Sequence, residues 1–166
     1  MIEVLDVWRG FWTTAIILAG TLLGFLFVAA ALRARKFFGE GRRLRALLYQ
    51  TVTAYSAVAM IGLLILMPML SQRRLGLAIA GVGTLLVLAS SWRVISAPKE
   101  RGGLLGILPA SACELLAWVS YVMITWAAYK LMRGLVHAVD WIALAVWLLL
   151  ASALSMSVQL LRRSAV

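Results

Sequence analysis

Glu114 is the residue of this sequence whose position most suggests chemistry, because it lies inside a hydrophobic run over residues 104–129. That run is long enough to cross a membrane as a helix, and Glu114 lies ten residues from its inner end, near mid-membrane. An ionisable group at such depth costs roughly 2.5 to 3.5 kcal/mol on insertion scales. Groups of this kind serve proton relays, ion paths and gates, so Glu114 is a functional candidate.

Other polar side chains share a face with Glu114 or lie at its depth. On a helical wheel, a stripe of about 80° collects the neighbours of Glu114 along the same run, namely Ser111, Trp118, Tyr121, Thr125 and Tyr129. Ser120 is the exception and falls on the far side. At similar depth in two other runs lie the hydroxyl groups of Tyr55, Ser56, Ser152 and Ser155. We therefore expect polar groups from several helices to meet around one carboxyl.

Two interpretations of this carboxyl remain open. Desolvation penalises the charged form of a carboxyl, so a carboxyl with hydroxyl partners could gain and lose a proton near neutral pH. This chemistry predicts a proton relay or a cation path. The alternative is a protonated Glu114 that hydrogen-bonds a neighbouring helix and holds the bundle together, typically for about 0.6 kcal/mol.

Catalytic and metal chemistry find little support among the residues. His137 and Asp140 are three residues apart at the expected outer mouth, where they could form a pH-sensitive pair or a weak metal site. Solvated interface residues are the simpler interpretation. His137 is the only histidine and Cys113 the only cysteine, which excludes a bis-histidine haem within one chain and a multi-cysteine zinc site. We expect no cofactor, no metal and no enzymatic activity.

The elements that must position these residues follow from composition. The chain has 166 residues, of which 64% are hydrophobic and 13% charged, whereas soluble domains average roughly 25% charged. Five apolar stretches each have about the length of a membrane-spanning helix, over residues 11–32, 46–70, 75–92, 104–129 and 135–161. We therefore predict an all-α polytopic membrane protein, with one transmembrane domain built as a bundle of about five helices.

The net charge of +10 is explained by topology. With the N-terminus outside, the inner segments hold eleven Lys and Arg and the outer segments five, which are Arg9, Arg73, Arg74, Lys130 and Arg133. This asymmetry predicts an N-out, C-in protein and leaves no reason to expect a nucleic-acid partner. Six inner charges could also bind lipid headgroups, although topogenic charge is the simpler explanation; they are Arg33, Arg35, Lys36, Arg42, Arg43 and Arg45.

Small and aromatic residues predict packing surfaces. Gly20 and Gly24 form a GxxxG motif, and a denser set of small residues includes Gly76, Ala80, Gly81 and Gly83. Such residues let helix backbones approach closely, and we expect packing within the protomer rather than a dimer seam. Aromatic belts at the two membrane interfaces would account for Trp8, Trp12 and Trp141 on the outside and for Trp92 and Tyr49 on the inside.

The stretch from Gly20 to Gly24, together with Pro68, resembles small bacterial multi-pass proteins, some of which are described as modulators of a membrane protease. These features are generic to membrane helices and imply no residue roles. The leading functional hypothesis is a homo-oligomer in the bacterial cytoplasmic membrane that conducts or transports ions, protons or other cations, around Glu114. The alternative is a non-catalytic regulatory or assembly subunit of a larger membrane complex, with the bilayer and a membrane protein as partners.

Overall fold

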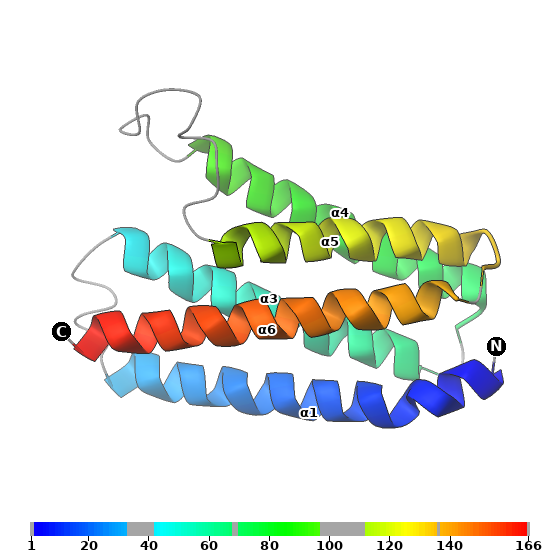
Figure 1. Cartoon of the computed structure of the whole chain (residues 1–166), viewed down its shortest axis with the longest axis horizontal. Coiled ribbons are helices and arrows are strands. Elements are labelled where there is room, and N and C mark those ends of the chain that lie inside the picture. The colour runs from blue at the N-terminus through cyan, green and yellow to red at the C-terminus, as the bar shows by residue number, and fades with distance from the viewer. Residues whose placement is uncertain (1, 33–41, 68–69, 97–111, 136, 166) are drawn as a thin grey trace. The chain divides into compact units, whose positions relative to one another are not determined.

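The computed structural model describes residues 2–32, 42–67, 70–96, 112–135 and 137–165. Over these residues the chain is helical, as Figure 1 shows. The helices are α1 (Ile2–Leu32), α3 (Arg42–Leu66), α4 (Gln72–Ser96), α5 (Ala112–Met132) and α6 (Ala138–Ala165). All five are long and apolar enough to cross a membrane, which confirms the all-α class and the five long apolar helices expected from run lengths.

Most helix bounds differ from the expected spans by three or four residues, and the starts of α1 and α5 need separate mention. Helix α1 begins at Ile2, well before the apolar stretch that was expected from residue 11. Helix α5 begins at Ala112, while the expected start at residue 104 lies outside the described residues.

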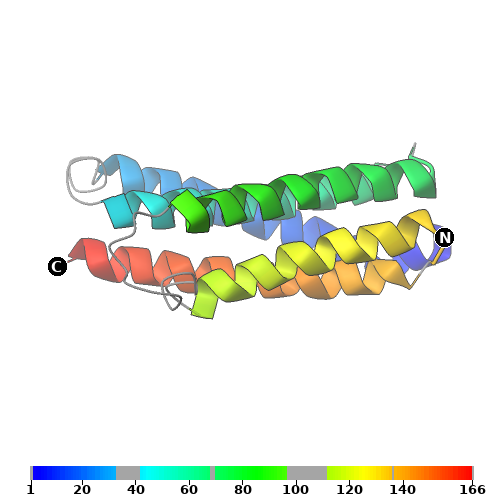
Figure 2. The same cartoon turned by 90° about the horizontal axis from the view of Figure 1, so that it is seen from above.

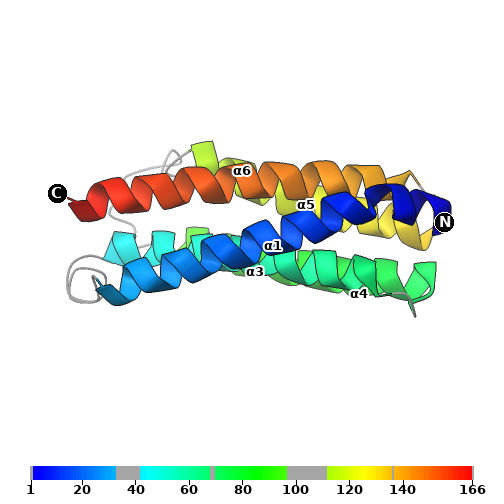
Figure 3. The same ribbon diagram turned by 90° about the horizontal axis from the view of Figure 1, so that it is seen from below.

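The chain divides into two compact units. Unit 1 comprises residues 1–69 and 149–166, and unit 2 comprises residues 70–148. In unit 1, α1 packs on α3, and Figure 3 shows α1 lying over α3. In unit 2, α4 packs on α5, and Figure 2 shows the two helices running alongside each other.

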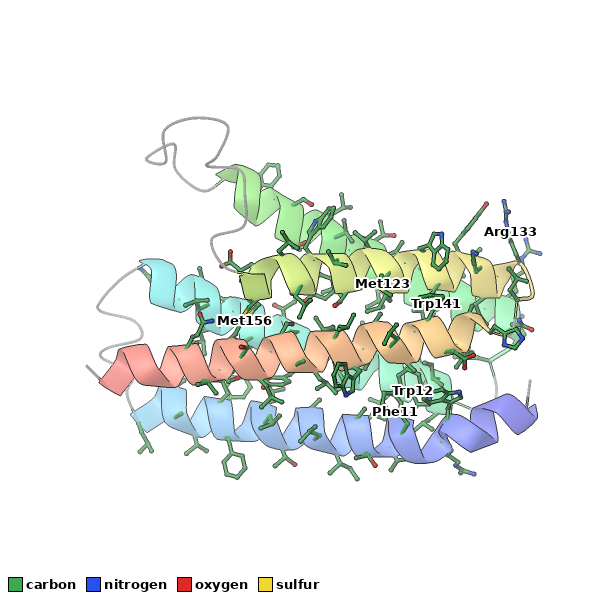
Figure 4. All side chains as sticks on the ribbon, viewed as in Figure 1. Phe11, Trp12, Met123, Arg133, Trp141 and Met156 are labelled. Atoms are coloured by element: carbon green, nitrogen blue, oxygen red, sulfur yellow. The ribbon has the colours of Figure 1, made fainter. Side chains whose placement is uncertain are left out.

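The core of unit 1 forms where α1 meets α3. Gly62 of α3 lies against α1, and a Cβ added there would be 2.6 Å from Cγ1 of Ile16. Trp12 of α1 is fully buried. Its ring meets the ring of Phe11 edge to face, with centroids 5.0 Å apart, and Figure 4 labels both residues. Trp12 is therefore a core residue of the described structure, and its place in an interfacial aromatic belt stays a prediction.

The core of unit 2 depends on glycines of α4 that allow close backbone approach. A Cβ added at Gly76 would be 3.0 Å from the carbonyl oxygen of Ala128 and 3.0 Å from the amide nitrogen of Met132. A Cβ at Gly83 would be 2.5 Å from Oγ1 of Thr125. This confirms packing within the protomer for these two glycines, whereas Gly81 of the same small-residue set faces open space.

The GxxxG motif of α1 behaves differently from the expectation. A Cβ added at Gly20 or Gly24 would meet nothing within 4 Å among the described parts of the chain. The buried face of α1 carries Trp12, Ala15 and Ala19, and the two glycines lie on the opposite, exposed face. Within unit 1, the described helices therefore leave this motif uncovered.

The end of α5 has a defined geometry. Gly134 adopts a left-handed conformation with φ of 87°. Its amide donates to the carbonyl of Leu131 at 3.0 Å, and the amide of Leu135 donates to the carbonyl of Lys130 at 3.2 Å. This pair of bonds is a Schellman motif, which stops a helix and satisfies its last carbonyls.

Candidate functional site

Glu114 lies in the first turn of α5, and its side chain is half-buried. Among the described residues the apolar span begins at Cys113, and the depth of Glu114 in a membrane stays a prediction. The mid-membrane depth was expected from a helix that begins at residue 104, and residues 97–111 lie outside the described ones.

The polar stripe around Glu114 lies along the border between the buried and the exposed faces of α5. Tyr121 is buried and Thr125 is half-buried, whereas Trp118 and Tyr129 are exposed. Ser111 lies outside the described residues. The stripe therefore does not form one uniformly buried, polar surface within unit 2.

Two contacts connect this stripe to α4. Nε1 of Trp118 donates a hydrogen bond to Oγ of Ser91 at 3.4 Å. Oγ1 of Thr125 donates to the carbonyl of Tyr121 at 2.9 Å and lies against the main chain at Gly83. Both contacts fasten α5 to α4, and Thr125 satisfies its hydroxyl within its own helix.

The hydroxyls expected at the depth of Glu114 in α3 and α6 belong to unit 1. Tyr55 is fully buried, and its hydroxyl lies 3.1 Å from Oγ of Ser157. Ser157 has one hydroxyl proton and donates it to the carbonyl of Ala153 at 2.9 Å, so Tyr55 is the donor of this pair. Ser152 is buried and donates to the carbonyl of Leu149, while Ser56 and Ser155 are exposed.

His137 and Asp140 form the pair expected from their spacing. Nδ1 of His137 lies 3.6 Å from Oδ2 of Asp140, and the side chains are 96% and 46% exposed. This exposure fits solvated interface residues. Within the ranges that the structure covers, no group of three or more His, Cys, Asp and Glu could hold a metal ion.

The six basic residues of the expected headgroup site are only partly described. Arg33, Arg35 and Lys36 lie outside the described residues. Arg42 and Arg43 lie in the first turn of α3, but their side chains are outside the described part as well. Arg45 is exposed.

Sequence reasoning missed four of the hydroxyls that are buried or that bridge two helices. Thr51 and Ser120 are completely buried, and Ser157 and Ser91 each accept a hydrogen bond from another helix. Ser120 falls on the face of α5 opposite to the polar stripe, and that face is the buried one. The wheel grouped polar residues together, but nothing in it indicated which face would be covered by a neighbouring helix.

Along α4, the described surface has a hollow lined by Leu85, Leu88, Ala89, Ser91 and Trp92. Ser91 is its only hydroxyl-bearing side chain, and the large side chains around it are apolar. Such a lining suits a hydrocarbon chain or an apolar side chain better than an ion. No protein family, no curated protein and no solved structure matches this chain.

Proposed function

We propose that this chain is a non-catalytic helical subunit that regulates or assembles with another membrane protein through lateral contacts of its helices. The observation that carries the proposal is the hydrogen bonding of its hydroxyl groups. Thr and Ser side chains on every helix donate to carbonyls of their own helix, and the hydroxyls of Tyr55 and Ser157 meet within unit 1.

An ion path needs polar groups that face water or one another along a continuous line. Here the buried hydroxyls of Thr51, Ser120 and Ser152 are each satisfied by a carbonyl three or four residues earlier. A hydroxyl bound in this way needs no water and can lie in an apolar environment at little cost. This pattern supports a packing role for the polar residues, which is the role they have in a scaffold.

Exposed helix faces support the lateral contact. Gly20 and Gly24 leave a shallow strip on α1 with nothing within 4 Å, flanked by the exposed side chains of Ile17 and Val28. In a bilayer, small residues on an outer face let another helix approach closely, and van der Waals packing then drives association. A second copy of this chain or a different membrane protein could supply that helix.

The experiment is affinity purification of the tagged full chain from native membranes in mild detergent. We expect Gly20→Leu with Gly24→Leu to lose the co-purifying partner, or the homo-oligomer, while the protomer stays folded. Gly10→Leu is the matched control, since a Cβ at Gly10 also meets nothing within 4 Å on the same helix. A wild-type chain that stays monomeric and partnerless, yet conducts ions in liposomes, would refute the proposal.

Ion conduction is the second candidate, favoured by the half-buried carboxyl of Glu114 within an apolar span. Glu114→Gln keeps the size and the hydrogen-bonding capacity of the side chain but cannot ionise. If the carboxyl carries the ion, this variant should abolish flux in liposomes while expression and oligomer size stay unchanged. If the variant conducts like the wild type at every pH, Glu114 does not carry the ion, and the subunit proposal is the one that remains.

Both candidate functions assume the same orientation in the membrane, which is inferred from the distribution of Lys and Arg along the chain. We propose that the N-terminus is outside and the C-terminus inside, in a bacterial cytoplasmic membrane. A reporter fused after Val166 should read cytoplasmic, and one inserted at Ser71 should read external. The same side for both reporters would contradict the five-span topology.

A further inference from the structure

One end of unit 2 collects basic side chains where three apolar spans end. The spans of α4 and α6 begin at Gln72 and Ala138, and that of α5 ends at Met132. Around these ends lie four basic residues, which we call the basic end of unit 2, namely Arg73, Arg74, Lys130 and Arg133. In a bilayer, the end of an apolar span lies at the level of the lipid headgroups.

Local contacts bring the four residues to the same end. Nε2 of Gln72 donates to the carbonyl of Leu131 at 3.4 Å, which ties the first turn of α4 to the last turn of α5. The close approach of Gly76 to Ala128 holds the two backbones together one turn further along. Arg73 and Arg74 directly follow Gln72 and are exposed, so they stand beside the end of α5 with their charges accessible.

Aromatic rings hold two of the basic side chains. Nζ of Lys130 lies 4.1 Å from the ring centroid of Trp126, and Cζ of Arg133 lies 4.5 Å from that of Tyr129. Arg133 also donates a hydrogen bond to the hydroxyl of Tyr129. These contacts restrict the long side chains before any ligand binds, which lowers the entropy lost on binding.

Two tryptophans lie next to these cations. Trp126 and Trp141 meet edge to face with ring centroids 6.0 Å apart, and each side chain is 46% exposed. Figure 4 shows Trp141 on α6 and Arg133 at the end of α5. An indole pairs an apolar ring with a polar N–H, which suits the boundary between acyl chains and headgroups.

The charge balance of this end favours an anion. Asp140, paired with His137, is the acid described at this end, so four cations face one carboxylate. Glu114, the other described acid of unit 2, lies at the opposite end of α5. The positive-inside rule does not account for these bases, because the charge count places them on the outer, charge-poor side.

We propose that the basic end of unit 2 binds the phosphate of an anionic phospholipid headgroup. Arginine forks match phosphate oxygens in a bidentate manner, and Lys130 adds a point charge. Trp126 and Trp141 then contact the glycerol region and the first methylenes of the lipid. These exposed apolar rings beside the cations make an amphipathic lipid a better fit than free inorganic phosphate.

The test is a lipid titration of the purified full chain by native mass spectrometry, with phosphatidylglycerol and phosphatidylcholine as probes. We expect the wild type to retain phosphatidylglycerol in preference. Lys130→Gln with Arg133→Gln should weaken retention on the order of 25-fold, at roughly fivefold for each charge removed. Arg73→Gln with Arg74→Gln changes exposed side chains of α4 and should also weaken retention of phosphatidylglycerol. This second variant replaces the first as the test if the first fails to fold.

Two controls separate this site from general charge. Arg9→Gln removes an exposed base from α1, outside unit 2, and should leave retention within about twofold. Lys130→Arg with Arg133→Lys keeps the charge and should keep the lipid. Equal retention of both lipids by the wild type, an equal loss in Arg9→Gln, or displacement of the lipid by millimolar inorganic phosphate would each overturn the proposal.

Discussion

The helix pairs at the centres of the two units achieve close contact in different ways. In unit 1, Gly62 makes room for a side chain, because the nearest atoms to an added Cβ belong to Ile16, at 2.6 and 3.0 Å. In unit 2, Gly76 and Gly83 also make room for main chain, with backbone atoms of Ala128 and Met132 at 3.0 Å and of Thr125 at 3.3 Å. The polar contacts differ as well, since the Tyr55–Ser157 bond of unit 1 is partly buried while the Trp118–Ser91 bond of unit 2 is exposed.

This difference predicts how well each glycine tolerates substitution. An isoleucine side chain can change rotamer and move away from a new methyl group, whereas the main chain of a helix moves only if the whole helix moves. Packed interiors resist such displacement because they have little free volume. The glycines of unit 2 should therefore tolerate substitution less than Gly62 of unit 1. The stability of unit 1 should depend more on its partly buried Tyr55–Ser157 hydrogen bond than that of unit 2 depends on the Trp118–Ser91 bond.

The largest effect is expected for Gly76→Leu. Its side chain would overlap the main chain of α5, and overpacking of this kind destabilises by about 3 kcal/mol. Gly81→Leu on the same helix is the control, since its Cβ meets open space and its stability should change by less than about 0.5 kcal/mol. The measurement is reversible unfolding in mixed micelles. Equal losses in both variants would show that backbone contact does not determine the stability of unit 2.

A smaller effect is expected for Gly62→Ala, which should lower the free energy of unfolding by about 1 kcal/mol, because the side chain of Ile16 can change rotamer. Ile16→Ala removes the clashing atoms, so the two substitutions together should be less destabilising than the sum of their separate effects. A double-mutant cycle measured by the same unfolding assay should give a coupling energy of about 1 kcal/mol. Strict additivity would mean that the contact between Gly62 and Ile16 is not a steric limit.

The smallest effect is expected from the interhelical hydrogen bonds. Tyr55→Phe should cost about 0.6 kcal/mol, because Ser157 keeps its bond to Ala153 and no donor is left unsatisfied. Trp118→Phe should cost less, since its bond to Ser91 is 3.4 Å long and exposed. Unfolding of both variants in one detergent checks the order, and a greater loss for Trp118→Phe would reverse the comparison between the units.

Much of the fold was predictable from the sequence. The five long helices were predicted from apolar runs whose length would cross a bilayer, and the structure has five helices of that length and apolarity. The contact between His137 and Asp140 was predictable too, since their spacing makes them neighbours on the first turn of a helix. The expected start of the fourth span at residue 104 stays a prediction, because residues 97–111 lie outside the described part of the chain.

The candidate site was predictable only in its residue types. Hydroxyl groups near the middle of the helices could be found by counting residues, and Tyr55 was among them. Its partner Ser157 was not distinguished from Ser152 or Ser155, although the three differ in burial and bonding. The rotation of α6 about its axis decides which serine meets Tyr55, and that rotation depends on packing.

The sequence by itself determined the class of the protein, the number of its long apolar helices and the neighbours within one helix, because these depend on local composition and on helical spacing. Only the tertiary structure decided that Gly76 and Gly83 pack while Gly20 and Gly24 stay open. In a soluble helix, a polar face would mark the exposed side. In α1, apolar residues cover both faces, so hydrophobicity carries no signal of which side another helix will cover.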